Sequence, residues 1–253
     1  MIVEFLGTGT SQGVPVIACD CDVCRSADKR DKRLRTSIMI EGEGQVIVID
    51  SGPDFRYQML RANVKHLDAI IFTHEHKDHI AGLDDIRAFN YRQNGPIDVY
   101  ADDRVQAALK REFSYIFDDF KYPGIPQLTL HAIGLEPFNI GKIRFIPIEV
   151  MHFKLPVLGF RINDFTYITD AKSVSDQEKE KIKGSKILVI NALQTQYHIS
   201  HFTLAEAIEF AKEIGAGKTY FTHISHRLGT HRDISAMLPP NIELAYDGLK
   251  LDI

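Results

Sequence analysis

Apolar and polar positions follow two different periods along the chain. Short apolar runs predict strands, whereas apolar positions spaced three and four residues apart predict helices. Strands are predicted at 2–6, 36–41, 45–50, 67–72, 97–101, 127–133, 142–150, 156–163, 165–169, 186–191 and 218–222, followed by a terminal pair of short strands. Helices are predicted at 55–62, 80–91, 102–113, 174–183 and 203–214, and the aromatic, turn-rich stretch 117–126 is predicted to be a loop.

The order of these elements predicts the fold class. Two β-rich blocks, each followed by helices, indicate two sheets packed face to face with helices outside, which is an α/β sandwich. No linker, internal repeat or low-complexity segment divides the sequence, so residues 1–253 are predicted to form one domain. With 44 % hydrophobic and 25 % charged residues, the chain can bury a large core.

Composition and charge indicate where the protein is located and which classes of partner it binds. No apolar run approaches the roughly 20 residues of a membrane span, and the first residues lack the basic region and cleavage site of a signal peptide. A cytoplasmic protein without membrane association is therefore expected. The net charge of −4 argues weakly against nucleic acid as a partner.

The highest concentration of potential metal ligands lies at residues 73–79, whose sequence is Thr-His-Glu-His-Lys-Asp-His. Three imidazoles and two carboxylates thus follow the strand predicted at 67–72, and these are the ligands that a borderline divalent metal prefers. Other ligand types stand where further predicted strands end, namely His152, Asp170 and His223. The shared placement predicts one metal centre and a metal-dependent hydrolase.

The three cysteines, Cys19, Cys21 and Cys24, lie within six positions. An odd number packed so closely cannot form a disulfide framework. In a reducing compartment the spacing favours three thiolates on one zinc, which still requires a fourth ligand. A redox cluster or unpaired structural thiols are the alternatives.

Several further positions have two interpretations each. The basic run 25–35 is either a solvated loop or a source of substrate contacts, with Arg35 placed to hold an anion. Asp50, at the end of an apolar run, caps the helix at 55–62, supports a metal ligand from behind, or does both. Three histidines are assigned to surface or cap positions: His66, His131 and His231.

The motif His74-x-His76-x-Asp78-His79, together with the three downstream residues, resembles the metallo-β-lactamase-fold hydrolases with a two-metal site. The resemblance covers essentially the whole chain and implies an αβ/βα four-layer sandwich of two mixed sheets with helices outside. It implies one metal on His74, His76 and His152. It implies a second metal on Asp78, His79 and His223, with Asp170 bridging the two.

Within this fold the chain is similar to the PhnP-type phosphodiesterases of carbon–phosphorus lyase pathways. The similarity includes the opening Gly-Thr-Gly loop, the cysteine cluster and the run Thr-His-Ile-Ser-His at 222–226. It implies a structural zinc on Cys19, Cys21, Cys24 and His226, within a small zinc-binding loop at about 19–26. Four ligands close a tetrahedron and leave no place for water, so this site is structural. A homodimer is also implied.

These expectations combine into a mechanism. Two divalent ions, zinc or manganese, would share a bridging hydroxide that attacks a small cyclic or sugar phosphate diester. His201 lies just before the helix that a Thr203/Glu206 capping box begins, and the resemblance makes it the proton donor, with His198 as its rival. Iron also suits this ligand set. The alternatives are a tRNA 3′-processing endonuclease, which the tRNase Z family suggests, and a metal-binding protein without catalysis.

Overall fold

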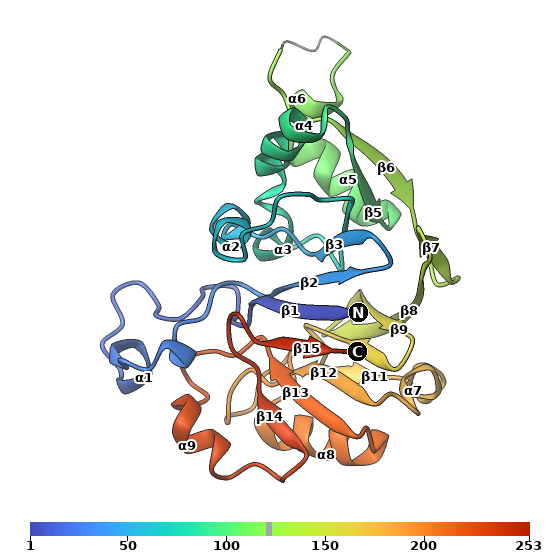
Figure 1. The fold of residues 1–253 in the computed structure, drawn as a ribbon. Helices are drawn as coiled ribbons and strands as arrows, with labels where there is room; N and C mark the ends of the chain where they lie inside the picture. The colour runs from blue at the N-terminus through green and yellow to red at the C-terminus, as the bar shows by residue number, and fades with distance from the viewer. Residues whose placement is uncertain (120–122) are drawn as a thin grey trace.

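The computed structural model describes residues 1–119 and 123–253, so part of the loop predicted at 117–126 lies outside the described residues. Two β-sheets pack face to face, and helices cover the outer face of each sheet (Figure 1). This is the four-layer arrangement predicted from the order of the elements. Within the described residues no helix is both long and apolar enough to cross a membrane.

The first sheet has the strand order β15-β1-β2-β3-β4-β5-β6. Its strands are β1 (Ile2–Gly7), β2 (Ser37–Gly42), β3 (Gln45–Ile49), β4 (Ala69–Ile71), β5 (Ile97–Ala101), β6 (Leu128–Ala132) and β15 (Lys250–Asp252). Pairing is antiparallel from β15 to β3 and parallel from β3 to β6. Ile38 and Ile40 of β2 pack between the sheets, whereas Met39 packs under the helices, as the two-residue period of a strand requires.

The second sheet has the strand order β11-β8-β9-β10-β12-β13-β14, and β7 pairs with β8 outside this path. Its strands are β7 (Phe138–Ile140), β8 (Ile143–His152), β9 (Leu155–Ile162), β10 (Phe165–Tyr167), β11 (Ser173–Val174), β12 (Ile187–Asn191), β13 (Lys218–Thr222) and β14 (Ile242–Leu244). The strands from β10 to β14 run parallel, so this sheet is also mixed. The terminal strands predicted as a pair belong to different sheets, because β14 joins β13 and β15 joins β1.

Helices form the two outer layers. The first sheet is covered by α2 (Phe55–Arg61), α3 (Lys77–Ile80), η2 (Leu83–Ile86), α4 (Arg87–Gln93), α5 (Asp103–Glu112) and α6 (Ser114–Phe117). The second sheet is covered by α7 (Asp176–Ile182), α8 (Leu204–Ile214) and α9 (His231–Ser235), while α1 (Asp22–Arg25) and η1 (Lys29–Asp31) lie in the N-terminal loop. The predicted capping box of α8 is present, with Thr203 and Glu206 bonding to each other's backbone N–H.

The single helix predicted over 80–91 was wrong, because the chain turns at Gly82. The Gly82 N–H donates to the Ser51 carbonyl at 2.8 Å, so it is unavailable to a continuous helix. A Cβ at Gly82 would lie 2.1 Å from the Gly52 carbonyl oxygen, so only glycine permits this approach. The close approach holds the loop after β3 against the segment that follows the histidine motif.

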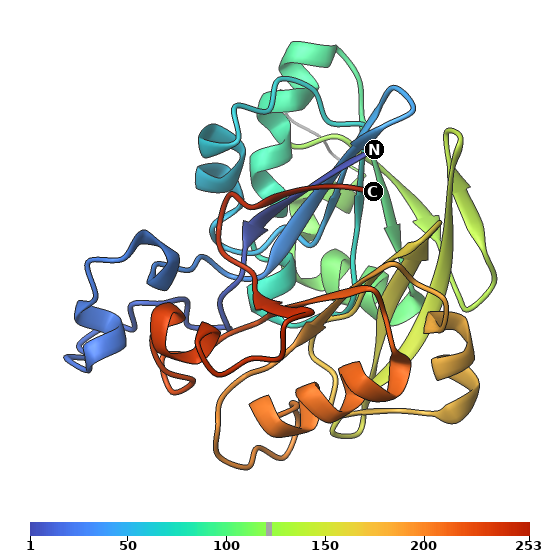
Figure 2. The same cartoon turned by 60° about the horizontal axis from the view of Figure 1, so that its bottom comes forward.

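The N-terminal loop lies beside the C-terminal segment that carries α9 (Figure 2). Arg33 is buried there and donates to the Thr8 hydroxyl and to the Ala245 carbonyl. Its guanidinium also lies 3.3 Å from Nδ1 of His231, which is buried too. The basic run is therefore not uniformly solvated. His231, predicted at a surface or cap position, is buried at the first residue of α9, so only the surface alternative was wrong.

Candidate metal centre

The predicted ligand residues gather where strands of both sheets end. His74 lies just beyond β4, His152 ends β8, and His223 follows β13 directly. Asp170 comes three residues after β10, and α3 carries Asp78 and His79. Strand ends from both sheets thus supply one cluster, as the sequence pattern predicts, in which Asp78 and His152 are half-buried and His76 is exposed.

Three residues of this region have a backbone conformation that side chains rarely adopt. The φ angles of Asp50, Asp170 and His223 are +65°, +55° and +54°. Left-handed backbone at a non-glycine residue costs of order 1–3 kcal/mol, and it persists only where the surroundings impose it. The strain coincides with the points where strands release their side chains into the cluster.

The ligand atoms lie within a few ångströms of one another. His79 Nε2 is 3.2 Å from Asp78 Oδ2 and 3.3 Å from Asp170 Oδ2. The other Asp170 oxygen, Oδ1, is 3.1 Å from His223 Nε2. Asp170 therefore lies between the two histidines and offers one oxygen to each side.

A second group adjoins the first. His74 Nε2 is 3.0 Å from His76 Nδ1, and the His152 ring lies 5.2 Å from that of His76 between centroids. The rings of His74 and His79 are 4.1 Å apart, which joins the two groups. The structure thus brings all seven predicted residues into one cluster with two adjoining parts.

Hydrogen bonds behind the rings orient three of these histidines. Asp50 Oδ2 lies 2.7 Å from His79 Nδ1, and the Thr73 hydroxyl lies 3.0 Å from His74 Nδ1. His152 Nδ1 donates to the Ser200 carbonyl at 2.8 Å. Such contacts fix the ring and leave Nε2 free as a ligand.

Asp50 therefore acts behind a ligand and does not cap the following helix. Its two oxygens accept hydrogen bonds from the Thr73 backbone N–H and hydroxyl, at 2.9 and 2.8 Å. The position before α2 is occupied by Asp54, which pairs with Arg35 at 2.9 Å. Thr73 was missed by the sequence reasoning, although its place directly before the first histidine of the motif indicated a role.

The electrostatics of the cluster favour a cation. Burial lowers the pKa of His79, but Asp78, Asp50 and Asp170 raise it more, so it lies well above its usual value. Burial raises the pKa of Asp170, yet His223 and His79 lower it further, so the net shift is downward. The buried carboxylate of Asp170 thus stays ionised and attracts positive charge, whereas burial raises the pKa of Asp50.

The donor set fits divalent metal ions. The Nε2 atoms of His79 and His223 face carboxylate oxygens at 3.1–3.3 Å without the geometry of a hydrogen bond. Buried polar atoms are normally paired, so nitrogens and oxygens that face one another in this way are suited to a cation between them. Imidazole nitrogens and carboxylate oxygens converging on one place meet the ligand preferences of zinc and manganese.

His201 lies against the same cluster. Its ring is stacked on His223 at 4.8 Å between centroids, and its Nδ1 lies 3.8 Å from Asp170 Oδ1. Burial, followed by the charge of His223, lowers the pKa of His201 to about 2. His198 is further out, with its ring 5.1 Å from that of His201. Of the two candidates for proton donor, only His201 contacts the buried ligands.

The fourth ligand of the cysteine cluster comes from a distant part of the sequence. The Sγ atoms of Cys19, Cys21 and Cys24 lie 3.2, 3.4 and 3.6 Å from His226 Nδ1. A hydrogen bond from the Cys24 backbone is the largest cause that lowers the pKa of Cys21, to about 6. Burial raises the pKa of Cys24 to about 11. Three sulfurs and one nitrogen around one point form a set suited to structural zinc.

A further feature is the environment of Arg35, for which one interpretation was that it holds an anion. Arg35 pairs with Asp54 and donates to the Ser11 carbonyl, so its charge is already partnered.

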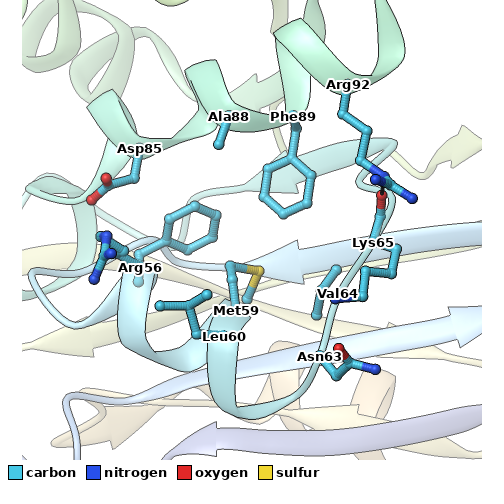
Figure 3. Close-up of a pocket in the computed structure, with 11 residues that line it drawn as sticks. Arg56, Met59, Leu60, Asn63, Val64, Lys65, Asp85, Ala88, Phe89 and Arg92 are labelled. Atoms are coloured by element: carbon cyan, nitrogen blue, oxygen red, sulfur yellow. Dashed lines mark hydrogen bonds between the residues drawn. The ribbon is translucent and has the colours of Figure 1, made fainter.

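A cavity of about 380 Å³ lies between α2 and α4 (Figure 3), and its lining includes Phe55, Met59 and Phe89. No candidate metal ligand lines this cavity.

Comparisons with known proteins identify a matching family and similar structures. The family described as Beta-lactamase superfamily domain matches residues 45–224. The crystal structure of a diphosphatase from the PhnP family superposes with a TM-score of 0.94 and 40 % identity, covering 100 % of this chain and 97 % of that one. These matches include the histidine motif and most of both sheets.

Two curated relatives have other names. An octanoyltransferase from Porphyromonas gingivalis is 40 % identical over 249 residues, which is 97 % of this chain. The chain spans about half the length of that relative, since the match covers 50 % of it. The coenzyme PQQ synthesis protein B of Rhodopseudomonas palustris is 30 % identical over 283 residues, covering 88 % of this chain and 89 % of that protein.

Proposed function

The chain belongs to the beta-lactamase superfamily, a family of metal-dependent hydrolases, and on that premise we propose that it hydrolyses a small cyclic or sugar phosphate diester. The observation that carries the proposal is the convergence of seven histidine and aspartate side chains on one cluster with two adjoining parts, of which His74, His79, Asp170 and His223 are buried. The 40 % identity to a PhnP-family diphosphatase supports a phosphorus ester or anhydride as the bond that is cleaved.

We assign His74, His76 and His152 to one ion and Asp78, His79 and His223 to the other, with Asp170 between them. When bound, two such ions activate a water molecule and neutralise phosphate oxygens. Zinc and manganese are both proposed, because imidazole and carboxylate ligands suit each of them. Asp50 and Thr73 hold the rings of His79 and His74 in the required orientation.

His201 is proposed as the group that gives a proton to the leaving oxygen. Its position beside His223 and Asp170 places the ring at the cluster. Burial and the charge of His223 lower the pKa of the ring, and an anionic phosphate diester bound beside it would favour its protonated form.

Cys19, Cys21, Cys24 and His226 are proposed to hold a structural zinc. Such a site ties the N-terminal loop to the segment that follows His223, and so stabilises the position of a catalytic ligand. The expected homodimer and the cytoplasmic location stay predictions.

The test is an activity panel on purified protein loaded with zinc or with manganese. It compares an aryl phosphodiester, a ribose cyclic phosphate, a pre-tRNA, an octanoyl thioester and a β-lactam. We expect metal-dependent hydrolysis of the small diesters, removed by a chelator and restored by metal. Cleavage of pre-tRNA alone would favour the endonuclease instead. Hydrolysis of the thioester alone would overturn the proposal, and inactivity on all five would favour a metal-binding protein without catalysis.

A further inference from the structure

A second feature adjoins the candidate metal centre directly. A pocket of about 460 Å³ is walled on one side by His76 and His152, the two histidines whose rings lie 5.2 Å apart. Its other walls are Phe153, Lys154 and Leu155 from the β8–β9 connection, and Ile199 and Ser200 from the loop before α8. A molecule held at the metal centre would therefore extend into this pocket, which is large enough for a fragment of nucleoside size.

Two side chains that line this pocket are apolar yet open to solvent. Phe153 and Ile199 are 51 % and 53 % exposed. Exposed large apolar side chains scattered singly need no explanation, but a group of them beside a cluster of ligands indicates a binding surface. The two loops thus present apolar faces to whatever group lies next to the reacting phosphate.

The backbone at Phe153 adds an independent observation. His152 pairs with Leu155, so Phe153 and Lys154 form a two-residue hairpin turn between β8 and β9. The φ angle of Phe153 is +57°, and turns of this kind favour glycine, asparagine or aspartate at such a position. A bulky aromatic residue there is an outlier, and outliers of this kind collect at ligand sites. The turn therefore holds a flat ring where its own stability favours a small residue.

Lys154 gives the pocket its charge. Its Nζ lies over the Phe153 ring, 5.4 Å from the centroid, so one face of the ring is next to an ammonium group. An acyl chain does not stack on a flat aromatic face, and it carries no charge along its length that would pair with an ammonium group. A planar ring attached to a phosphate uses both features.

We propose that this pocket binds the aromatic base of a nucleotide whose phosphate lies at the metal centre. The base stacks on Phe153, Ile199 packs against it, and Lys154 contacts an adjacent phosphate or a ring acceptor. The proposal rests on the function proposed above and narrows the substrate class to nucleotidyl phosphate diesters or diphosphates. Phe153 is then a residue that determines specificity and not one that takes part in bond cleavage.

The activity test compares two diesters with the same leaving group on the metal-loaded enzyme. One is the p-nitrophenyl ester of thymidine 5′-phosphate, and the other is methyl p-nitrophenyl phosphate, which has no base. Phe153→Leu keeps an apolar side chain but removes the flat face. We expect it to lower kcat/KM about tenfold for the thymidine ester, mostly through KM, because one base–aromatic stack is lost. The methyl ester should be unaffected, and Phe153→Tyr should restore the difference.

A binding test does not depend on turnover. Calorimetric titration of the metal-loaded protein with adenosine 5′-monophosphate and with ribose 5-phosphate separates the contribution of the base from that of the phosphate. Phe153→Leu should weaken binding of the first ligand and leave the second unchanged. The matched control is Tyr57→Leu, which changes an aromatic residue that is 58 % exposed on α2, away from this pocket.

The outcomes separate the two proposals. If no diester is hydrolysed but the base still strengthens binding through Phe153, the proposed function fails and the pocket stands. Equal effects of Phe153→Leu on both esters and both ligands would overturn the pocket and leave the hydrolase intact. Tighter binding of octyl phosphate than of adenosine 5′-monophosphate would identify an acyl site instead. A dimer that Phe153→Asp dissociates would identify an interface between copies, and would also overturn the inference.

Discussion

Replacing Asp50 by asparagine should weaken metal binding at the His79 side of the centre. The change keeps the size of a fully buried side chain and removes only its charge and one acceptor. In the native protein, Oδ1 accepts from the Thr73 N–H, while Oδ2 accepts from the Thr73 hydroxyl and from His79 Nδ1. An asparagine amide has one oxygen and one NH₂ group, so it cannot repeat this pattern.

Either orientation of the amide creates a conflict. With NH₂ at the Oδ1 position, it faces the Thr73 N–H. With NH₂ at the Oδ2 position, it faces His79 Nδ1 and favours the tautomer that protonates Nε2, the nitrogen needed as a ligand. A buried donor left unpaired costs about 1–3 kcal/mol, which corresponds to roughly 5- to 150-fold in an equilibrium constant. Residues behind metal ligands affect metal affinity to a similar extent, about 10- to 100-fold.

The assay is competition for zinc or manganese between the protein and a chromophoric chelator. The matched control is Asp68→Asn, because Asp68 also accepts from a histidine, His66, at 2.9 Å and from a backbone N–H. That pair lies at the opposite end of β4, away from the centre. We expect Asp68→Asn to keep native metal affinity. Unchanged affinity in Asp50→Asn, with native folding, would refute the reasoning about the tautomer.

Three further predictions address other parts of the molecule. Cys21→Ser should lose one tightly bound zinc per chain and unfold at a lower temperature, with the other metals retained; metal analysis showing unchanged zinc would exclude the structural site. His201→Ala should bind metals normally yet lose about 10²–10⁴-fold in turnover of a diester with a poor leaving group, whereas His198→Ala should not. Burial, followed by the charge of Arg33, lowers the pKa of His231 to about 4 in the folded protein. As the pH falls, this histidine is therefore protonated in the unfolded state before it is protonated in the folded state. The free energy of unfolding should therefore fall as pH drops from about 6.5 toward 4, and His231→Gln should show a smaller fall in pH-dependent denaturation.

The parts of the site that are local in sequence could be predicted from it. The motif at 73–79 is contiguous, and a predicted strand end precedes each of His152, Asp170 and His223. Features that depend on distant backbone could not be predicted. The break at Gly82 follows from its contact with Gly52, whose position is set by the end of another strand.

The burial of charged residues also could not be predicted from the sequence alone. Arg33 stands in a basic run that has the composition of a solvated loop, yet its partners include the Ala245 carbonyl, more than 200 positions away. His231 also has a partner that is distant in sequence, because its backbone N–H donates to Asp31, 200 positions earlier. A pattern read over a few neighbouring residues carries no information about such partners.

The left-handed backbone at Asp50, Asp170 and His223 has a consequence for how this sequence can change over time. Glycine adopts positive φ without a clash between Cβ and the following carbonyl, so glycine would relieve the backbone at each of the three positions. At Asp50 this gain is opposed, because glycine would leave the buried Thr73 N–H and hydroxyl without their acceptor. At Asp170 and His223, selection for stability alone, in nature or in a directed-evolution experiment, therefore acts against the side chain. A variant line freed from the need for the metal centre should drift toward glycine at these two positions first. Persistence of this aspartate and this histidine would then record selection for chemistry rather than for the fold.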